Sequence, residues 1–115
     1  MTDLLKVRVE NVTYEWIGKG NMAFGLFLEL PIVTFDLKGV SAGKTIPQEW
    51  HIKYNYDYLF NNPKKFVDNT PAHEVAHLIE WKLYGKCGHK KNWKEIMHTF
   101  GFENPTRCHN YKIIL

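Results

Sequence analysis

The chain has 115 residues, 44% hydrophobic and 15% aromatic, a composition that suits one packed domain and excludes an intrinsically disordered chain. The formal net charge of +3 is mild, so it assigns no partner by itself. No apolar run is long enough to cross a membrane, and no basic segment followed by an apolar stretch and a cleavage site opens the chain. We therefore expect a protein of the cytoplasm, or of the nucleoid or nucleus, that is not secreted.

The first half of the chain contains two predicted strands. Residues 2–17 are ambiguous, because their apolar positions fit both an alternating strand and a helical face. Residues 32–37 and 50–55 are rich in β-branched and aromatic side chains, which is typical of strands. We expect these two strands to pair antiparallel, with a turn at residues 39–43 between them.

A helix is predicted to begin at Asn62 and Pro63, since asparagine is a favoured cap and proline suits the first helical position. Residues 64–69 continue it, and Pro71 is a candidate site for a kink.

The second half of the chain is mainly helical. Residues 72–84 have a clear helical pattern that ends at Gly85, and residues 91–100 form another helix that ends at Gly101. The tail, residues 102–115, is expected to be extended. This order of elements predicts an α+β fold in a single domain that spans the whole chain.

The predicted helix at 72–84 carries the sequence HExxH. His73 and His77 lie four residues apart, so both imidazoles face the same way and can bind one ion. Glu74 lies roughly 100° further round the helix, where it is better placed to hold a water on that ion than to bind it. Two histidine ligands and a carboxylate base are the signature of a zinc hydrolase, and one Zn²⁺ is the predicted cofactor.

A catalytic zinc needs a third protein ligand and an open position for water. Our choice is His89, because Gly85 and Gly88 let the chain turn back toward the helix before it. We expect His98 to be a surface or packing residue. Glu80 lies three residues after His77 on the same helix and has two interpretations, a residue that supports a metal ligand or, as we expect, a solvated glutamate. The other candidates for the third ligand are the downstream acids and four further residues, namely His51, His109, Cys87 and Cys108. Both cysteines are expected to be free thiols.

Four lysines cluster after the predicted helix at 72–84, with no acidic residue between them. They are Lys86, Lys90, Lys91 and Lys94. Such a cluster can attract a phosphate backbone, and a weak contact with DNA is one interpretation. The other interpretation is an ordinary solvated helix start.

Five stretches together resemble the SprT-like family of zinc metalloproteases, which includes the DNA-dependent protease Spartan. The HExxH stretch is residues 71–77, and it is followed by 88–97 and 107–111. Residues 39–43 and 51–55 resemble the hairpin that precedes the metal helix in this family.

The resemblance covers roughly residues 22–113. It implies a minimal zincin-like core, a first segment that is helical, zinc ligands at His73, His77 and His89, and a catalytic base at Glu74. It also implies metallopeptidase activity toward protein substrates, including proteins attached to DNA. Lys90 stands where family members commonly have glycine, and the C-terminal zinc ribbon of bacterial members has no counterpart before Leu115.

In the expected mechanism Glu74 takes a proton from a zinc-activated water and passes it to the leaving amine. His109 and Tyr111 are candidates for stabilising the oxyanion, although packing roles suit them equally. Trp93 is expected to pack the last helix against the metal helix. A zinc-stabilised adaptor for DNA or protein is the main alternative, and a small metal-dependent ribonuclease is a second. The oligomeric state is not predicted.

Overall fold

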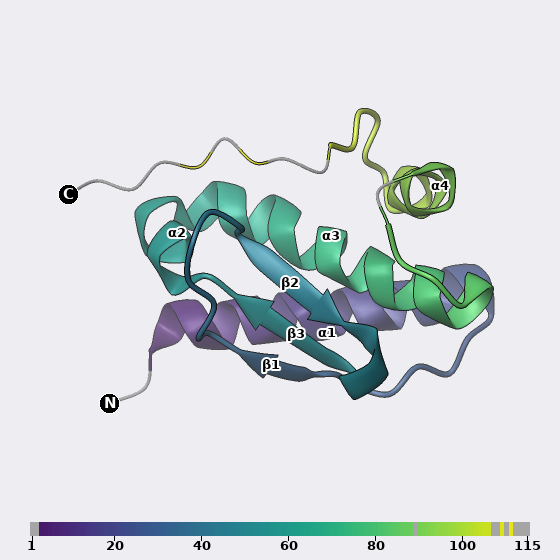
Figure 1. The fold of residues 1–115 in the computed structure, drawn as a ribbon, viewed down its shortest axis with the longest axis horizontal. Coiled ribbons are helices and arrows are strands. Elements are labelled where there is room, and N and C mark those ends of the chain that lie inside the picture. The colour runs from purple at the N-terminus through teal and green to yellow at the C-terminus, as the bar shows by residue number, and fades with distance from the viewer. Residues whose placement is uncertain (1–2, 89, 107–108, 110, 112–115) are drawn as a thin grey trace.

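The structure is a computed structural model, which describes residues 3–88, 90–106, 109 and 111 (Figure 1). The elements along the chain are α1 (Leu4–Phe24), β1 (Ile32–Thr34), β2 (Gly43–Ile46), the 3₁₀ helix η1 (Pro47–Glu49), β3 (His51–Tyr54), α2 (Tyr56–Asn61), α3 (Pro63–Tyr84) and α4 (Lys91–Thr99). The fold is α+β, as predicted. No helix in the described part of the chain is long and apolar enough to span a membrane.

The ambiguous N-terminal segment is a helix, α1. Asp3 caps it, because its carboxylate accepts hydrogen bonds from the N–H groups of Leu5 and Lys6 at 3.0 and 3.3 Å. Gly25 ends it in the left-handed conformation, with φ of 64°. At Gly20 the helix lies close to α3, since a Cβ there would come within 2.5 Å of the Ile79 side chain.

The sheet has three strands in the order β1-β3-β2. β2 and β3 form an antiparallel pair, whereas β1 is parallel to β3. The predicted antiparallel pairing of the 32–37 and 50–55 segments is therefore wrong. The reason is an unpredicted strand, Gly43–Ile46, which begins where the turn was expected to end and takes the antiparallel place beside β3. The chain between β1 and β2 crosses to the opposite edge of the sheet.

α3 is one helix of 22 residues, and it runs through Pro71. It begins at Pro63, as predicted, but the Asn62 side chain donates to the Tyr58 carbonyl in α2 instead of capping α3. The short helix α2 was not predicted. Gly85 ends α3 in the left-handed conformation, with φ of 73°.

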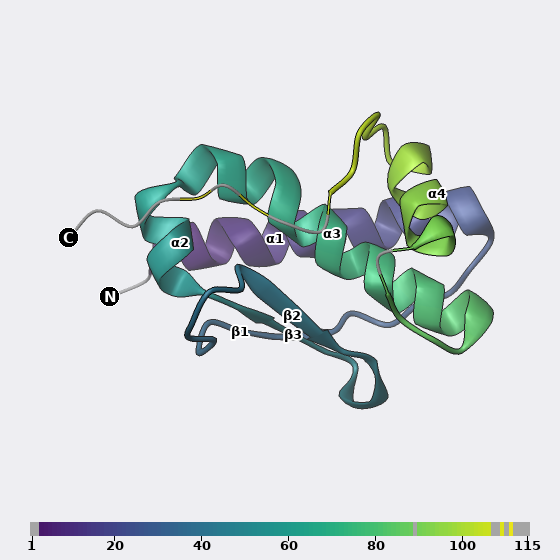
Figure 2. The ribbon, with the colours of Figure 1, turned by 45° about the horizontal axis from the view of Figure 1, so that its top comes forward.

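α3 is the central element of the fold. It contacts α1, α2, α4 and β2, and the sheet lies to one side of the α1–α3 pair while α4 lies near the C-terminal end of α3 (Figures 1 and 2). Twelve of its 22 residues are buried, against four of 21 in α1. The largest fully buried side chains come from α1, β3, α2, α3 and α4, and they include Ile17, Tyr54, Leu59, Phe66 and Trp93. The HExxH segment therefore lies on the helix with the largest buried share among the described helices.

Candidate metal centre

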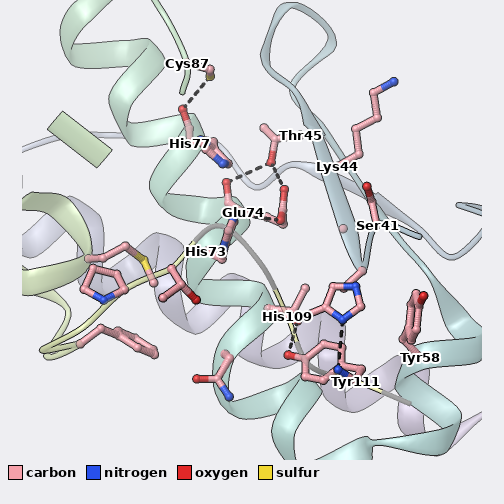
Figure 3. A pocket seen from close by; sticks show the side chains of 18 of the residues that line it. Ser41, Lys44, Thr45, Tyr58, His73, Glu74, His77, Cys87, His109 and Tyr111 are labelled. Atoms are coloured by element: carbon pink, nitrogen blue, oxygen red, sulfur yellow. Dashed lines mark hydrogen bonds and ion pairs between the residues drawn. The ribbon is translucent and has the colours of Figure 1, made fainter. Parts of the chain in front are cut away.

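The HExxH residues line a cavity of about 1170 Å³. One wall of it is β2 with the loop before it, and another is α3. The lining is completed by Tyr58 of α2, Cys87 and Gly88 of the loop after α3, Met97 of α4, and the C-terminal residues Phe102, Asn104, Pro105, Thr106, His109 and Tyr111. Figure 3 shows His73, Glu74 and His77 on the α3 side of this cavity, with Thr45 opposite and His109 and Tyr111 further along.

His73 and His77 lie on one face of α3, as the four-residue spacing predicted. Their ring centroids are 5.1 Å apart. Trp93 of α4 contacts both rings, at centroid distances of 4.7 Å from His73 and 5.7 Å from His77, and its indole N–H donates to the His73 carbonyl at 3.2 Å. The prediction that Trp93 packs the last helix against the HExxH helix, α3, is confirmed. This packing restricts the orientation of both imidazoles.

Glu74 points from α3 toward β2 and is only 4% exposed. Its Oε1 accepts a hydrogen bond of 2.8 Å from the Thr45 hydroxyl, and its Oε2 lies 3.8 Å from Nε2 of His73. Burial raises the pKa of Glu74 from 4.5 to about 7, although the hydrogen bond from Thr45 opposes the shift. A carboxyl group with a pKa near neutrality is suited to take up and release a proton.

Glu80 is buried, with 3% exposure, so the expectation of a solvated glutamate is wrong. It lies one turn beyond His77 on α3, and its Oε1 is 3.9 Å from Nδ1 of that histidine. The same oxygen accepts a hydrogen bond of 2.8 Å from the Gly88 N–H, which ties the loop after α3 to the helix. Burial raises the pKa of Glu80, while the Gly88 hydrogen bond and the charge of Lys86 oppose the rise.

Cys87 is a free thiol beside these groups. Its Sγ donates to the His77 carbonyl at 3.2 Å. The residue as a whole is exposed, but partial burial of the sulfur and the charges of Glu80 and Glu74 raise the pKa of the thiol to about 11. Without a metal the thiol therefore stays protonated at neutral pH.

Among the described residues, one group of three side chains brings possible metal-ligand atoms within 4.8 Å of one another, namely His77, Glu80 and Cys87. His89, the predicted third ligand, lies outside the described residues. His77 belongs both to this group and to the predicted ligand set. Within this group, its ring atom near Glu80 is Nδ1. A ligating histidine commonly turns its other ring nitrogen to a carboxylate, and the Glu80 carboxylate lies on the Nδ1 side of His77 at 3.9 Å. Two imidazoles on one helix face, with Glu74 beside one of them, fit the nitrogen donors that zinc takes.

The C-terminal segment reaches the other end of the cavity. Nε2 of His109 lies 2.7 Å from the Val40 carbonyl, and the Tyr111 hydroxyl is within 2.7 Å of the Thr70 hydroxyl and donates to the Lys65 carbonyl. Both residues line the cavity. Their polar atoms hold these two residues against the loop before β2 and against α3, and their role with an oxyanion stays a prediction.

The four predicted lysines are exposed on the loop after α3 and on the first turns of α4. His98 is exposed on α4, as expected. Cys108 lies outside the described residues. Sequence reasoning missed Thr45 and Gly43, because a short strand with no apolar run gave no sign that it faces Glu74.

Comparison with known proteins places the chain in a family. Residues 15–111 match the SprT-like family. The chain is 31% identical over 107 residues to Protein SprT of Actinobacillus succinogenes, covering 92% of this chain and 62% of that protein. It is 32% identical to Protein SprT of Vibrio parahaemolyticus, covering 95% of this chain and 67% of the relative. For Protein SprT of Pseudomonas putida strain GB-1 the identity is 34%, covering 98% and 68%.

No solved structure matches the chain significantly. The chain spans about two thirds of the length of these curated relatives, so the comparison concerns the part of them that it covers. The match extends over β2, all of α3 and α4, and therefore over the whole HExxH segment and the cavity around it. The chain belongs to the SprT-like family, which is associated with metal binding and is consistent with a metallopeptidase.

Proposed function

We propose that the chain is a zinc metallopeptidase in which His73, His77 and His89 hold one Zn²⁺ and Glu74 is the general base. The observation that carries this proposal is the position of Glu74. Its buried carboxylate lies 3.8 Å from Nε2 of a candidate ligand and faces a cavity, and its pKa is near 7. A purely structural zinc site has no need of such a group.

Zinc bound here would lower the pKa of a coordinated water and polarise the scissile carbonyl. Glu74 takes a proton from the attacking water as the new C–O bond forms at the carbonyl carbon. It then delivers that proton to the amide nitrogen as the C–N bond breaks, which releases a carboxylic acid and an amine. In the metal-free protein, burial holds the pKa of this carboxyl group at about 7.

The size of the cavity supports a polypeptide substrate. Its volume of about 1170 Å³ gives a peptide segment room between β2 and α3. We further propose that the substrates include proteins bound to DNA. The exposed lysines that follow α3 support this extension, because their charge attracts a phosphate backbone.

The test is the Glu74→Gln variant, assayed on unfolded protein and on DNA-bound protein, with and without DNA. We expect turnover to fall by about 10²–10⁴-fold, because the amide cannot accept the proton. Zinc content, measured by metal analysis after gel filtration, is expected to stay at the wild-type level. The matched control is Glu95→Gln, at an exposed glutamate of α4. Wild-type protein that binds zinc but cleaves none of these substrates would contradict the proposal and favour the adaptor.

A further inference from the structure

Two residues of strand β2 face α3, the helix that carries the HExxH segment. Successive side chains of a strand point to opposite faces, so Gly43 and Thr45 share one face and Lys44 has the other. Gly43 and Thr45 lie against Glu74, whereas the Lys44 side chain extends away from Glu74 (Figure 3). This face of β2 therefore meets the proposed general base directly.

Thr45 holds one oxygen of the carboxylate. Its hydroxyl lies 2.8 Å from Oε1 of Glu74 and 3.1 Å from the backbone carbonyl of the same residue. The contact joins residues 29 positions apart, so it depends on β2 packing against α3. With Oε1 bound to this donor, Oε2 is the oxygen left beside Nε2 of His73.

Gly43 leaves the space that the carboxylate occupies. A Cβ at this position would lie 2.9 Å from Oε2, and 3.0 Å from both Cδ and Cγ of Glu74. Real Cβ atoms are hardly ever found so close to other atoms. Any side chain at position 43 would therefore push the end of Glu74 away, while the backbone of strand and helix could stay in place.

We propose that Gly43 and Thr45 are positioning residues that select Oε2 of Glu74 as the oxygen that takes the proton. This inference rests on the proposed function, since it concerns the orientation of the same base. A free glutamate side chain samples several rotamers, and a reacting group displaced by about 1 Å can lose on the order of 10²-fold in rate. The hydroxyl and the missing side chain together exclude the other orientations before the substrate arrives.

The first test removes only the hydroxyl, in Thr45→Val. We expect kcat to fall about 10- to 100-fold, with KM and zinc content unchanged, because the base is misplaced while substrate and metal still bind. Thr45→Ser restores the hydroxyl and is expected to recover most of the loss. The matched control is Thr34→Val in β1, where the hydroxyl contacts Asp36 and His51 instead of Glu74. A lower melting temperature with unchanged kcat would overturn the proposal.

The second test fills the space, in Gly43→Ala. It is expected to lower kcat by a similar factor without loss of zinc. Gly18→Ala in α1 is the control, since a Cβ there meets nothing within 4 Å. Full activity of Gly43→Ala would overturn the role of this glycine.

A crystal structure of each zinc-loaded variant tests the inference without any assay of activity. We expect the Glu74 carboxylate to leave its place, by about 1 Å or more, in Thr45→Val and in Gly43→Ala but not in the controls. If wild type is inactive and the carboxylate still moves in this way, the proposed function fails while the positioning contact stands. If wild type is active and Glu74 keeps its orientation in both variants, the inference fails alone.

Discussion

The two sides of the HExxH segment are supported by different parts of the chain. On the sheet side, Glu74 rests against Thr45 and Gly43 of β2. On the other side, His77 lies near Glu80, which binds the loop after α3 through the Gly88 N–H. The sheet side supplies a hydroxyl and an empty space, whereas the loop side supplies a carboxylate.

This difference indicates that the two sides have separable tasks. A neutral donor such as Thr45 orients the carboxylate of Glu74 and moderates the rise in its pKa. A carboxylate near Nδ1 of His77 favours the proton on that nitrogen and leaves the other one for a metal. We therefore expect substitutions on the sheet side to change turnover, and substitutions on the loop side to change metal affinity.

The largest effect on the loop side is expected for His77→Ala, which removes a proposed ligand. The variant should lose stoichiometric zinc, because two remaining protein ligands do not form a closed site. Metal analysis after dialysis against a weak chelator measures this. The control is His98→Ala, since His98 is exposed on α4, and it should keep its zinc. A full equivalent of tightly bound zinc in His77→Ala would contradict the ligand assignment.

On the sheet side, the buried carboxyl of Glu74 should make the stability of the metal-free protein depend on pH. Its pKa is about 7 when folded and 4.5 ordinarily, so the folded state binds more protons between these values. The free energy of unfolding therefore falls as pH rises from about 4.5 to about 7, by about 3 kcal/mol at 1.36 kcal/mol per pKa unit.

Glu74→Gln removes this carboxyl but keeps an acceptor for the Thr45 hydroxyl. Relative to wild type, the metal-free variant should gain stability across that pH range and keep the gain at higher pH. Chemical denaturation of both metal-free proteins from pH 4 to pH 9 measures the difference between them. If the free energies of unfolding of the two proteins changed in parallel with pH, burial would not raise the pKa of Glu74.

The smallest effect is expected for Glu80→Gln, which keeps the acceptor for Gly88 and removes only the charge near His77. Zinc affinity is expected to fall about 10- to 100-fold, as for other carboxylates that support a ligating histidine. Competition with a fluorescent chelator gives the ratio, and Glu95→Gln serves as the exposed control. A variant with normal zinc affinity and impaired turnover would break the proposed division between the two sides.

Local sequence patterns predicted α3 and α4, but they left α1 ambiguous and missed α2. Pro63 and Gly85 bound α3 as expected, and the spacing of His73 and His77 predicted their shared face. These features depend on residues within a few positions of one another, where helix geometry decides the outcome. The resemblance to a known family, rather than any pattern within residues 2–17, indicated that the first segment is helical.

The packing of Trp93 against α3 was predicted, but other features that depend on distant residues were missed or wrong. β2 has no apolar run, so its pairing with β3 and the parallel placement of β1 did not show in the sequence. Glu80 looks like a solvated charge until the loop that covers it is known. Thr45 becomes part of the site only through its contact with a residue 29 positions away.

That separation also has a consequence for the order of folding. A helix such as α3 forms from local contacts in microseconds or less, whereas a contact across 29 residues waits for the sheet to dock. The HExxH helix can therefore exist in a nascent chain before its glutamate is oriented. A chain at that stage carries the whole motif but not the oriented Glu74 carboxylate, so the proposed activity requires the completed fold.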